Sequence, residues 1–239
     1  MEDKTQEGHR QRLRQKFLKA GLAGFHDYEI VEMLLTLGRT RSDCKRQAKE
    51  AIKKFKTLRG VLAASPEELQ EIEGIGPASI FSVRLIQEVA QEFLKEKVLE
   101  KPFCKSSKEV YDYLNFSMRD LSKELFKGMF LNAQNQIIEV ENLFEGTLTA
   151  SAIYHREIVE KAIKHNAAAL IFAHNHPSGN PEPSNEDKQI TRDLVFVGNV
   201  MQIKVLDHII IGDNKYFSFA DAGLLEKYNL DFSSQGKKR

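Results

Sequence analysis

The residues best suited to chemistry lie in the segment AHNHPSGNPEPSNED, from Ala173 to Asp187. His174 and His176 end a continuous apolar run, residues 167–174, which is typical of a strand buried on both faces. Residues two apart in a strand point to the same side. The spacing therefore predicts that both imidazoles reach one point at the end of this strand.

The residues that follow complete a set of metal ligands. A proline-rich loop restricts the backbone and leads to Ser184, which is expected to cap a helix. Asp187 then falls in the first turn, where the helix dipole favours an ionised carboxylate. Two histidines and one carboxylate leave the fourth tetrahedral position of zinc open, as in catalytic sites. We therefore expect one zinc ion per chain, held by His174, His176 and Asp187.

This spacing is familiar. His-x-His-Pro, six residues and Ser-x-x-Asp resembles the JAMM motif of MPN-domain metalloproteases, which include deubiquitinating isopeptidases. More closely, residues 143–194 together with LDHIIIGD at 206–213 resemble the bacterial RadC-like (UPF0758) family, whose members join a helical N-terminal region to such a domain. The resemblance implies a metal-dependent hydrolase of peptidase or isopeptidase type, acting on a peptide or protein substrate.

The resemblance also implies two catalytic side chains. JAMM enzymes take a general base from an early strand, and Glu124 in KELFKGMFLN matches it by position, with Glu141 and Glu145 as rivals. The alternative is that Glu124 is an ordinary surface residue at the start of a strand. Ser184 is expected to stabilise the oxyanion or hold the water, or else simply to cap its helix.

Two further observations bear on the site. RadC-like sequences commonly read Leu-Asp at the end of the first strand, where this chain has Leu131-Asn132; activity is weakened if that carboxylate matters. Among the remaining histidines of this half, only His208, beside Asp207, is expected to support a metal ligand.

The N-terminal half contains a second motif. Residues 69–77, LQEIEGIGP, resemble a helix-hairpin-helix, in which Gly74 and Gly76 let the backbone approach a DNA phosphate. The preceding helix is acidic, and Ile80 stands where the motif usually has a small alanine, so a hairpin that only packs helices is the alternative. DNA is thus a second expected partner, through the N-terminal helices.

The elements that position these residues suggest two domains. Residues 1–98 show helical periodicity and predict an all-α domain, with the helix-hairpin-helix-like motif at about 65–97. A linker is expected at 99–106. Residues 107–230 alternate strands and helices, which predicts an α/β (α+β) domain of MPN/JAMM type with a mixed sheet flanked by helices. Residues 231–239 are expected to form a disordered tail.

More detailed expectations concern the strands and the ends of the elements. We expect strands at 125–133, 136–142, 143–151, 167–174, 202–213 and 215–220, with helices near 107–117 and at 155–166. In the first half, Ser65 is expected to cap a helix with Pro66 at its first position and Glu68 completing a capping box.

Bulk properties limit the function classes. The 239 residues carry a net charge of +1, so no overall field requires a nucleic-acid partner. The two cysteines suit a reducing compartment. No apolar run approaches the roughly 18–20 residues that a membrane span needs, and the N-terminus lacks a signal sequence. A cytoplasmic protein without a membrane partner is expected. The two competing functions are a zinc hydrolase and a DNA-associated repair or recombination protein whose metal-binding domain is not hydrolytic.

Overall fold

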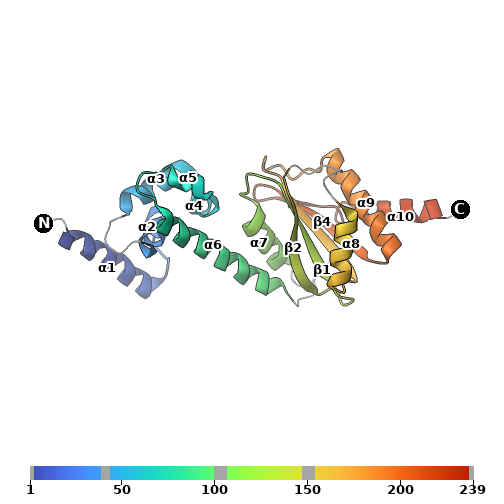
Figure 1. Ribbon diagram of the computed structural model, residues 1–239, viewed down its shortest axis with the longest axis horizontal. Helices are drawn as coiled ribbons and strands as arrows, with labels where there is room; N and C mark the ends of the chain where they lie inside the picture. The colour runs from blue at the N-terminus through green and yellow to red at the C-terminus, as the bar shows by residue number, and fades with distance from the viewer. Residues whose placement is uncertain (1–2, 39–43, 100–106, 147–153, 237–239) are drawn as a thin grey trace. The chain divides into compact units, whose positions relative to one another are not determined.

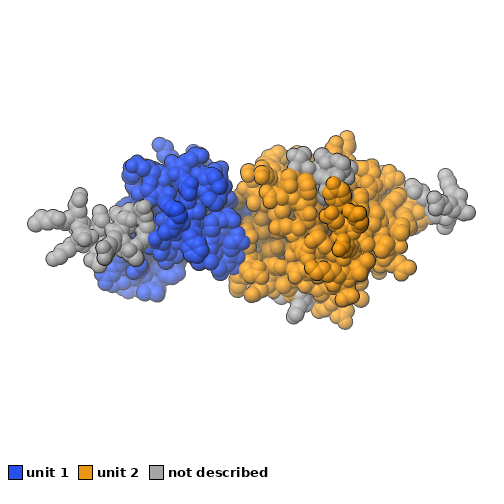
Figure 2. Space-filling model, viewed as in Figure 1, with its two compact units in different colours: residues 1–90 blue, residues 91–239 orange. Residues whose placement is uncertain are grey.

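The computed structural model describes residues 3–38, 44–99, 107–146 and 154–236. It divides into two compact units, residues 1–90 and 91–239 (Figure 2). The expected boundary after residue 98 falls later than this division, which lies inside one long helix. Residues 100–106, most of the expected linker, are outside the described residues.

The N-terminal unit is built from helices, as expected. These are α1 (Asp3–Ala20), α2 (Asp27–Leu37), α3 (Lys45–Phe55), α4 (Leu58–Ala63), α5 (Pro66–Gln70) and α6 (Pro77–Val98), the last continuing into the second unit. The apolar faces of α2 to α6 form one core around the fully buried Val31, Leu69 and Val83. Ser65 caps α5: its hydroxyl accepts from the Glu68 N–H, and the Glu68 carboxylate accepts from the Ser65 N–H, which confirms the predicted capping box.

The C-terminal unit contains a five-stranded mixed sheet. Its elements are α7 (Ser107–Met118), β1 (Leu125–Leu131), β2 (Ile137–Glu145), α8 (His155–Lys164), β3 (Ala169–Asn175), α9 (Asn185–Met201), β4 (Lys204–Ile211), β5 (Tyr216–Ser218) and α10 (Leu224–Gly236). The strand order is β2-β1-β3-β4-β5. Only β3 and β4 run parallel, joined by α9, and the other neighbours are antiparallel.

Helices cover both faces of this sheet (Figure 1). On one face α7 packs its Leu114 and Met118 against a core that includes Met129 of β1. On the other face, α8 and α9 pack against a core that includes Phe126 and Phe172. Every residue of β3 is buried, as its apolar run predicted. The strand that carries the histidines is thus the central, doubly covered strand of the sheet.

Two expectations about the ends of elements need correction. Residues 143–145 do not begin a third strand but continue β2, because Phe144 and Glu145 still pair with Phe126 and Leu125 of β1. Residues 147–153 lie outside the described residues. The expected disordered tail from 231 is also wrong as far as Gly236, where α10 ends. Phe232 stacks edge-on against Phe196 of α9, which explains why the helix continues.

The strand directions bring the chemical residues to one edge of the sheet. Because β1 and β3 are antiparallel, Phe126 near the start of β1 pairs with His174 near the end of β3. The start of α9 follows β3 by a short loop, so it returns to the same edge. In sheets of this kind, ligand sites form outside the carboxyl ends of the strands. Glu124, His174 and Asp187 therefore converge although they come from separate elements.

Candidate metal centre

Three ligand atoms meet at this edge. His174 Nε2 lies 3.0 Å from His176 Nε2 and 3.1 Å from Asp187 Oδ1, and His176 Nε2 lies 3.3 Å from Asp187 Oδ2. Zinc ligands at about 2.0–2.1 Å in tetrahedral geometry stand about 3.3 Å apart. The two contacts of Asp187 use different carboxylate oxygens. With one ligand atom taken from each side chain, the three atoms lie within 4.8 Å of one another, so the structure brings the sequence-predicted ligands close enough together to share one ion.

The protein fixes the orientation of the His176 ring. Its Nδ1 lies 2.8 Å from the backbone carbonyl oxygen of Asn180. Because a carbonyl only accepts hydrogen bonds, Nδ1 carries the proton of the neutral ring and Nε2 keeps its lone pair. The His176 N–H donates to the Ile211 carbonyl at 2.9 Å, which ties the residue to the end of β4.

The loop between the histidines and α9 is held against the turn after β4. Gly179 adopts φ +79°, a left-handed conformation that favours glycine, and its carbonyl accepts from the Asp213 N–H at 2.8 Å. A side chain at Gly212 would lie 2.4 Å from the Gly179 carbonyl oxygen, so the two backbones pack closely only because this residue is glycine. This packing positions the loop so that the Asn180 carbonyl lies next to the His176 ring.

Ser184 and Asp187 form the N-terminal cap of α9. The Ser184 hydroxyl donates to Asp187 Oδ2 at 2.7 Å and accepts from the Asp187 N–H at 3.0 Å, while the Ser184 N–H donates to Oδ2 at 2.8 Å. The capping function considered for Ser184 is therefore present. The same contacts aim the Asp187 carboxylate at the two histidines.

The electrostatics suit a cation. Burial raises the pKa of Asp187, but hydrogen bonding to His174, His176 and Ser184 outweighs it and holds this pKa far below its usual value. Burial lowers the pKa of the fully enclosed His174, against the opposing effect of Asp187. Hydrogen bonding to Asp187 raises the pKa of His176. Asp187 is thus ionised and His174 is neutral, the protonation states that metal ligands require.

Glu124 lies beside the triad. It directly precedes β1, and its carbonyl accepts from the Gly146 N–H at 2.9 Å. The negative charge of Glu124 raises the pKa of both His174 and His176. On each ring this effect is smaller than the effects of burial and of Asp187. This effect on both rings places the Glu124 carboxylate in the electrostatic surroundings of the histidine ligands.

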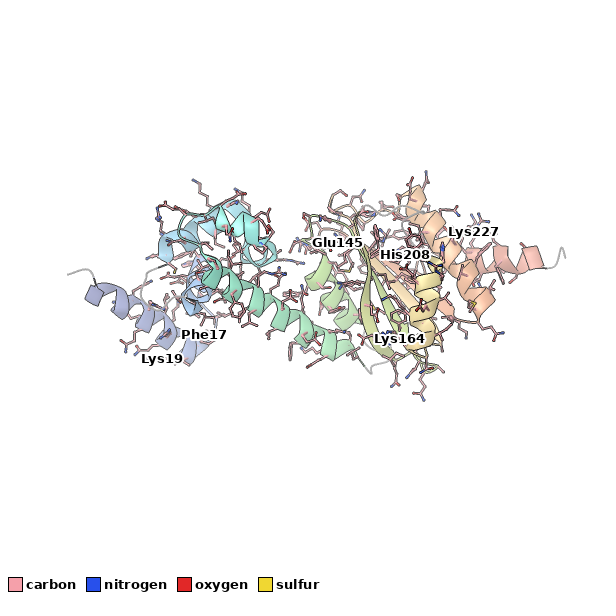
Figure 3. All side chains as sticks on the ribbon, in the orientation of Figure 1. Phe17, Lys19, Glu145, Lys164, His208 and Lys227 are labelled. Atoms are coloured by element: carbon pink, nitrogen blue, oxygen red, sulfur yellow. The ribbon has the colours of Figure 1, made fainter. Side chains whose placement is uncertain are left out.

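The two rival glutamates are engaged elsewhere. Glu141 is bonded to the Lys161 ammonium and lies 2.6 Å from His165 Nε2, both presented by the end of α8. Glu145, labelled in Figure 3, is largely exposed and lies 3.7 Å from the Lys123 ammonium. Of the three glutamates, it is Glu124 whose charge raises the pKa of His174 and His176.

A residue that sequence reasoning missed holds the segment before β1. The side chain of Asn175, buried between the two histidines, accepts from the Leu125 N–H at 2.8 Å and donates to the carbonyls of Leu121 and Lys123 at 3.4 and 3.1 Å. Strand alternation turns it away from its neighbours. Its position inside His-Asn-His was visible in the sequence, but its partners, about fifty residues earlier, were not.

Two further residues lie behind His174, and of these only His208 was expected from the sequence. His208, labelled in Figure 3, is fully buried in β4, and its Nε2 lies 2.8 Å from His174 Nδ1, as expected for a residue that supports a ligand. Thr191 of α9, which sequence reasoning missed, has its hydroxyl oxygen 2.6 Å from His208 Nδ1. His165 pairs with Glu141 instead.

Asn132, which stands where RadC-like sequences commonly have aspartate, lies away from the candidate metal site. Asn132 follows the end of β1 opposite to Glu124, and its Oδ1 accepts from the N–H groups of Gln134 and Gln136 at 2.9 and 3.0 Å. This is the local turn geometry that Asn and Asp share. The residue thus shapes the turn from β1 to β2.

Gly74 and Gly76 lie in the N-terminal unit, in the turn between α5 and α6. Gly74 has φ +90°, a left-handed conformation that favours glycine, so the turn itself accounts for this residue. A Cβ on Gly76 would meet no atom within 4 Å. Nearby cations are already paired: Arg46 with Glu73 at 3.3 Å, and Lys54 with Glu71 at 2.7 Å.

Comparison with known proteins agrees with this fold and site. Residues 104–224 match the family described as RadC-like JAB domain, and residues 6–81 match the family described as UPF0758 N-terminal. The chain is 38% identical over 215 residues to a UPF0758 protein of Nitrosomonas europaea, covering 90% of this chain and 96% of that one. It is 39% identical over 232 residues to one from Fusobacterium nucleatum, covering 94% of this chain and all of that one.

The C-terminal unit is thus a RadC-like JAB domain that carries a His-His-Asp cluster able to hold a metal ion. With both of its regions matched, the chain belongs to the UPF0758 family. None of the helices within the described residues is long and apolar enough to cross a membrane.

Proposed function

We propose that this protein is a zinc-dependent hydrolase that cleaves an amide bond in a peptide or protein. The observation that carries the proposal is the convergence of His174, His176 and Asp187 beside Glu124 at one edge of the sheet. This arrangement places a three-ligand metal site next to a carboxylate that is not one of the ligands.

The donor set itself calls for a cation. When each ring is neutral and protonated on Nδ1, both Nε2 atoms and the Asp187 carboxylate oxygens are acceptors, and they lie 3.0–3.3 Å apart. Acceptors this close repel one another unless a proton or a metal ion lies between them. Two imidazoles and one carboxylate are ligands that zinc accepts, and three protein ligands leave a tetrahedral ion one open position. The residues present therefore fit zinc.

The protein side chains divide the work of hydrolysis. Zinc at this site would polarise the substrate carbonyl and lower the pKa of an attacking water to about 7. Glu124 takes the proton of that water and returns it to the departing amine, which requires a carboxylate close to the ligands but not bound among them. Ser184 would donate its hydroxyl to the oxyanion after releasing its bond to Asp187 Oδ2, while its oxygen still accepts from the Asp187 N–H and keeps α9 capped.

The test compares two glutamate variants of the full-length protein, Glu124→Gln and Glu145→Gln. Each is incubated in the zinc-loaded form with a mixture of proteome-derived peptides and branched isopeptides, and new amino termini are counted by mass spectrometry. We expect cleavage by wild type and Glu145→Gln, and a rate at least about 100-fold lower for Glu124→Gln. All three should retain one zinc ion. Equal rates in both variants, or no cleavage by zinc-loaded wild type, contradict the proposal.

The alternative function, a DNA-associated repair or recombination protein with a non-hydrolytic metal domain, has one supporting feature. The open space at Gly76, at the start of α6, leaves the backbone accessible to a phosphate. The pairing of Arg46 and Lys54 with glutamates counts against it. The Gly76→Ala variant should fold normally, so weaker duplex binding by this variant, together with a steep loss of affinity as salt increases, would support the DNA role.

The cytoplasmic location expected from cysteine usage stays a prediction. Cys44 is a buried free thiol, which is compatible with a reducing compartment.

A further inference from the structure

A chain of three hydrogen bonds runs behind the metal site, on the side of His174 away from the ligand atoms. The Thr191 hydroxyl oxygen lies 2.5 Å from the Asp187 carbonyl oxygen and 2.6 Å from His208 Nδ1. His208 Nε2 lies 2.8 Å from His174 Nδ1. All of these residues except Asp187, at 2% exposure, are fully buried, so water does not compete for the bonds.

The position of each proton in this series of hydrogen bonds follows from the bond at the Asp187 carbonyl. The Asp187 carbonyl can only accept, so the Thr191 hydroxyl must donate to it. The Thr191 oxygen can then only accept from His208, which places the His208 proton on Nδ1. A neutral His208 therefore has a lone pair on Nε2 and accepts from His174 Nδ1–H. The consequence is that His174 Nε2 is left without a proton, facing the metal.

The opposite assignment is disfavoured by the same distances. If Thr191 donated to His208 instead, its oxygen would face the Asp187 carbonyl oxygen at 2.5 Å without a hydrogen between them. If His208 were doubly protonated, it would donate to His174 Nδ1 and force the His174 proton onto Nε2, where a metal must bind. A charge would also be enclosed by aromatic rings, since Phe219 stacks on His208 at 5.1 Å and Phe126 meets it edge-on.

We propose that Thr191 and His208 are positioning residues that hold His174 in the Nδ1–H tautomer and thereby keep its Nε2 available to the metal ion. This inference deepens the proposed metal site and rests on it for its functional meaning. The arrangement differs from that of His176, whose tautomer is set directly by a backbone carbonyl. For His174 the backbone carbonyl acts through two intervening side chains, so the tautomer depends on both of them.

The proposal predicts a specific effect of removing one hydroxyl. In Thr191→Val, His208 loses the acceptor for its Nδ1–H, and its proton can move to Nε2. It then donates to His174 Nδ1, and the His174 proton moves to Nε2. Thr191→Ser keeps the hydroxyl and serves as the matched control. The two substitutions differ from wild type by similar volumes, so a general packing defect would affect both.

The first measurement uses metal-free, full-length protein with ¹⁵N-labelled histidine, in which long-range ¹H–¹⁵N spectra identify the protonated nitrogen of each ring. We expect the Nδ1–H tautomer of His174 in wild type and Thr191→Ser, and a substantial Nε2–H population in Thr191→Val. The second measurement is zinc affinity, by competition with a chromophoric chelator. We expect 10–100-fold weaker binding by Thr191→Val, the usual effect of removing a hydrogen-bond partner of a metal ligand, and near-normal binding by Thr191→Ser.

The outcomes separate this inference from the proposed function. An Nε2–H tautomer of His174 in metal-free wild type overturns the positioning role, whether or not the variants fold. An unchanged tautomer and zinc affinity in Thr191→Val overturns it as well. Failure of wild type to bind zinc removes the proposed hydrolase, but the tautomer spectra of the metal-free protein still decide whether Thr191 and His208 direct the His174 proton.

Discussion

The side-chain oxygen of Asn175 accepts a hydrogen bond from the Leu125 N–H at 2.8 Å, which links the middle of the His-Asn-His sequence to the residue after Glu124. His174 on one face of β3, and His176 directly after the strand, are the proposed ligands, whereas Asn175 on the opposite face fixes the segment that carries the proposed base. The placement of Glu124 relative to the proposed metal site therefore depends on Asn175, which binds the neighbouring residue Leu125 and is not itself a proposed ligand.

The first prediction tests this dependence with Asn175→Ala. We expect zinc content to stay at one ion per chain, because the ligands project from the other side of β3. Hydrolysis should fall by about 100-fold, the cost of displacing a catalytic group by about 1 Å. The unpaired Leu125 N–H should lower the free energy of unfolding by about 1–3 kcal/mol. Metal analysis, initial rates and urea unfolding measure the three quantities. Loss of zinc, or undiminished hydrolysis by a variant that retains zinc, would show that Asn175 has a different role.

The second prediction concerns the ligands. His176→Ala and Asp187→Ala should weaken zinc binding by more than about 100-fold, beyond the 10–100-fold typical of residues that only support a ligand. His155→Ala, which changes a histidine in the same unit that lies outside the ligand cluster, is the control. Chelator competition gives the affinities, and circular dichroism confirms that each variant is folded. Zinc bound as tightly by the two ligand variants as by the control would refute the site.

The third prediction follows from the position of Asn132. Asn132→Asp restores the residue common in RadC-like sequences, and its carboxylate can accept the same bonds from Gln134 and Gln136. It loses only the donation from Nδ2 to Gln136 Oε1 at 2.8 Å. Because β1 separates this turn from Glu124 by about 20 Å of extended chain, we expect unchanged zinc affinity and hydrolysis, and a stability change below about 1 kcal/mol. A large gain in hydrolysis would mean that the carboxylate acts in a way this geometry does not provide.

The fourth prediction is a pH dependence of stability. Hydrogen bonds from Lys161, and then from His165, outweigh the opposing effect of burial and hold the pKa of Glu141 below its ordinary value of 4.5. The ionised form therefore stabilises the fold above pH 4.5, and this contribution disappears as the pH falls through the lowered pKa. Glu141→Gln should cost about 1 kcal/mol at pH 7 and progressively less below pH 4.5. Urea unfolding of both proteins across this range checks the sign; a difference that grows toward low pH contradicts it.

The metal triad and the strand–loop–helix that carries it were predictable because they depend on local rules. Strand alternation aligns His174 with His176, and helix capping places Asp187 in the first turn of α9. These rules operate within about fifteen residues of one another, and one sequence contains all of the information that they need.

The supporting residues were not predictable in the same way. The roles of Thr191 and Asn175 depend on which elements pack together and in what register. Thr191 bonds to His208, 17 positions away, and Asn175 bonds to Leu121, more than 50 positions away. The end of α10 was missed for a related reason: local composition suggested disorder, but packing of Phe232 on Phe196 stabilises the helix. Tertiary contacts override local preference in both cases.

The cap of α9 has a consequence for the protein without its ion. The Asp187 carboxylate, which closes the first turn of this helix by accepting from the Ser184 N–H, is also a proposed metal ligand. Removing the ion leaves Asp187 to face two imidazole lone pairs, so the carboxylate is drawn toward any available proton and away from the cap. Chelation should therefore accelerate amide hydrogen exchange at Ser184 and Asp187 while the strands of the sheet remain protected, making the opening turn of α9 a local reporter of metal occupancy.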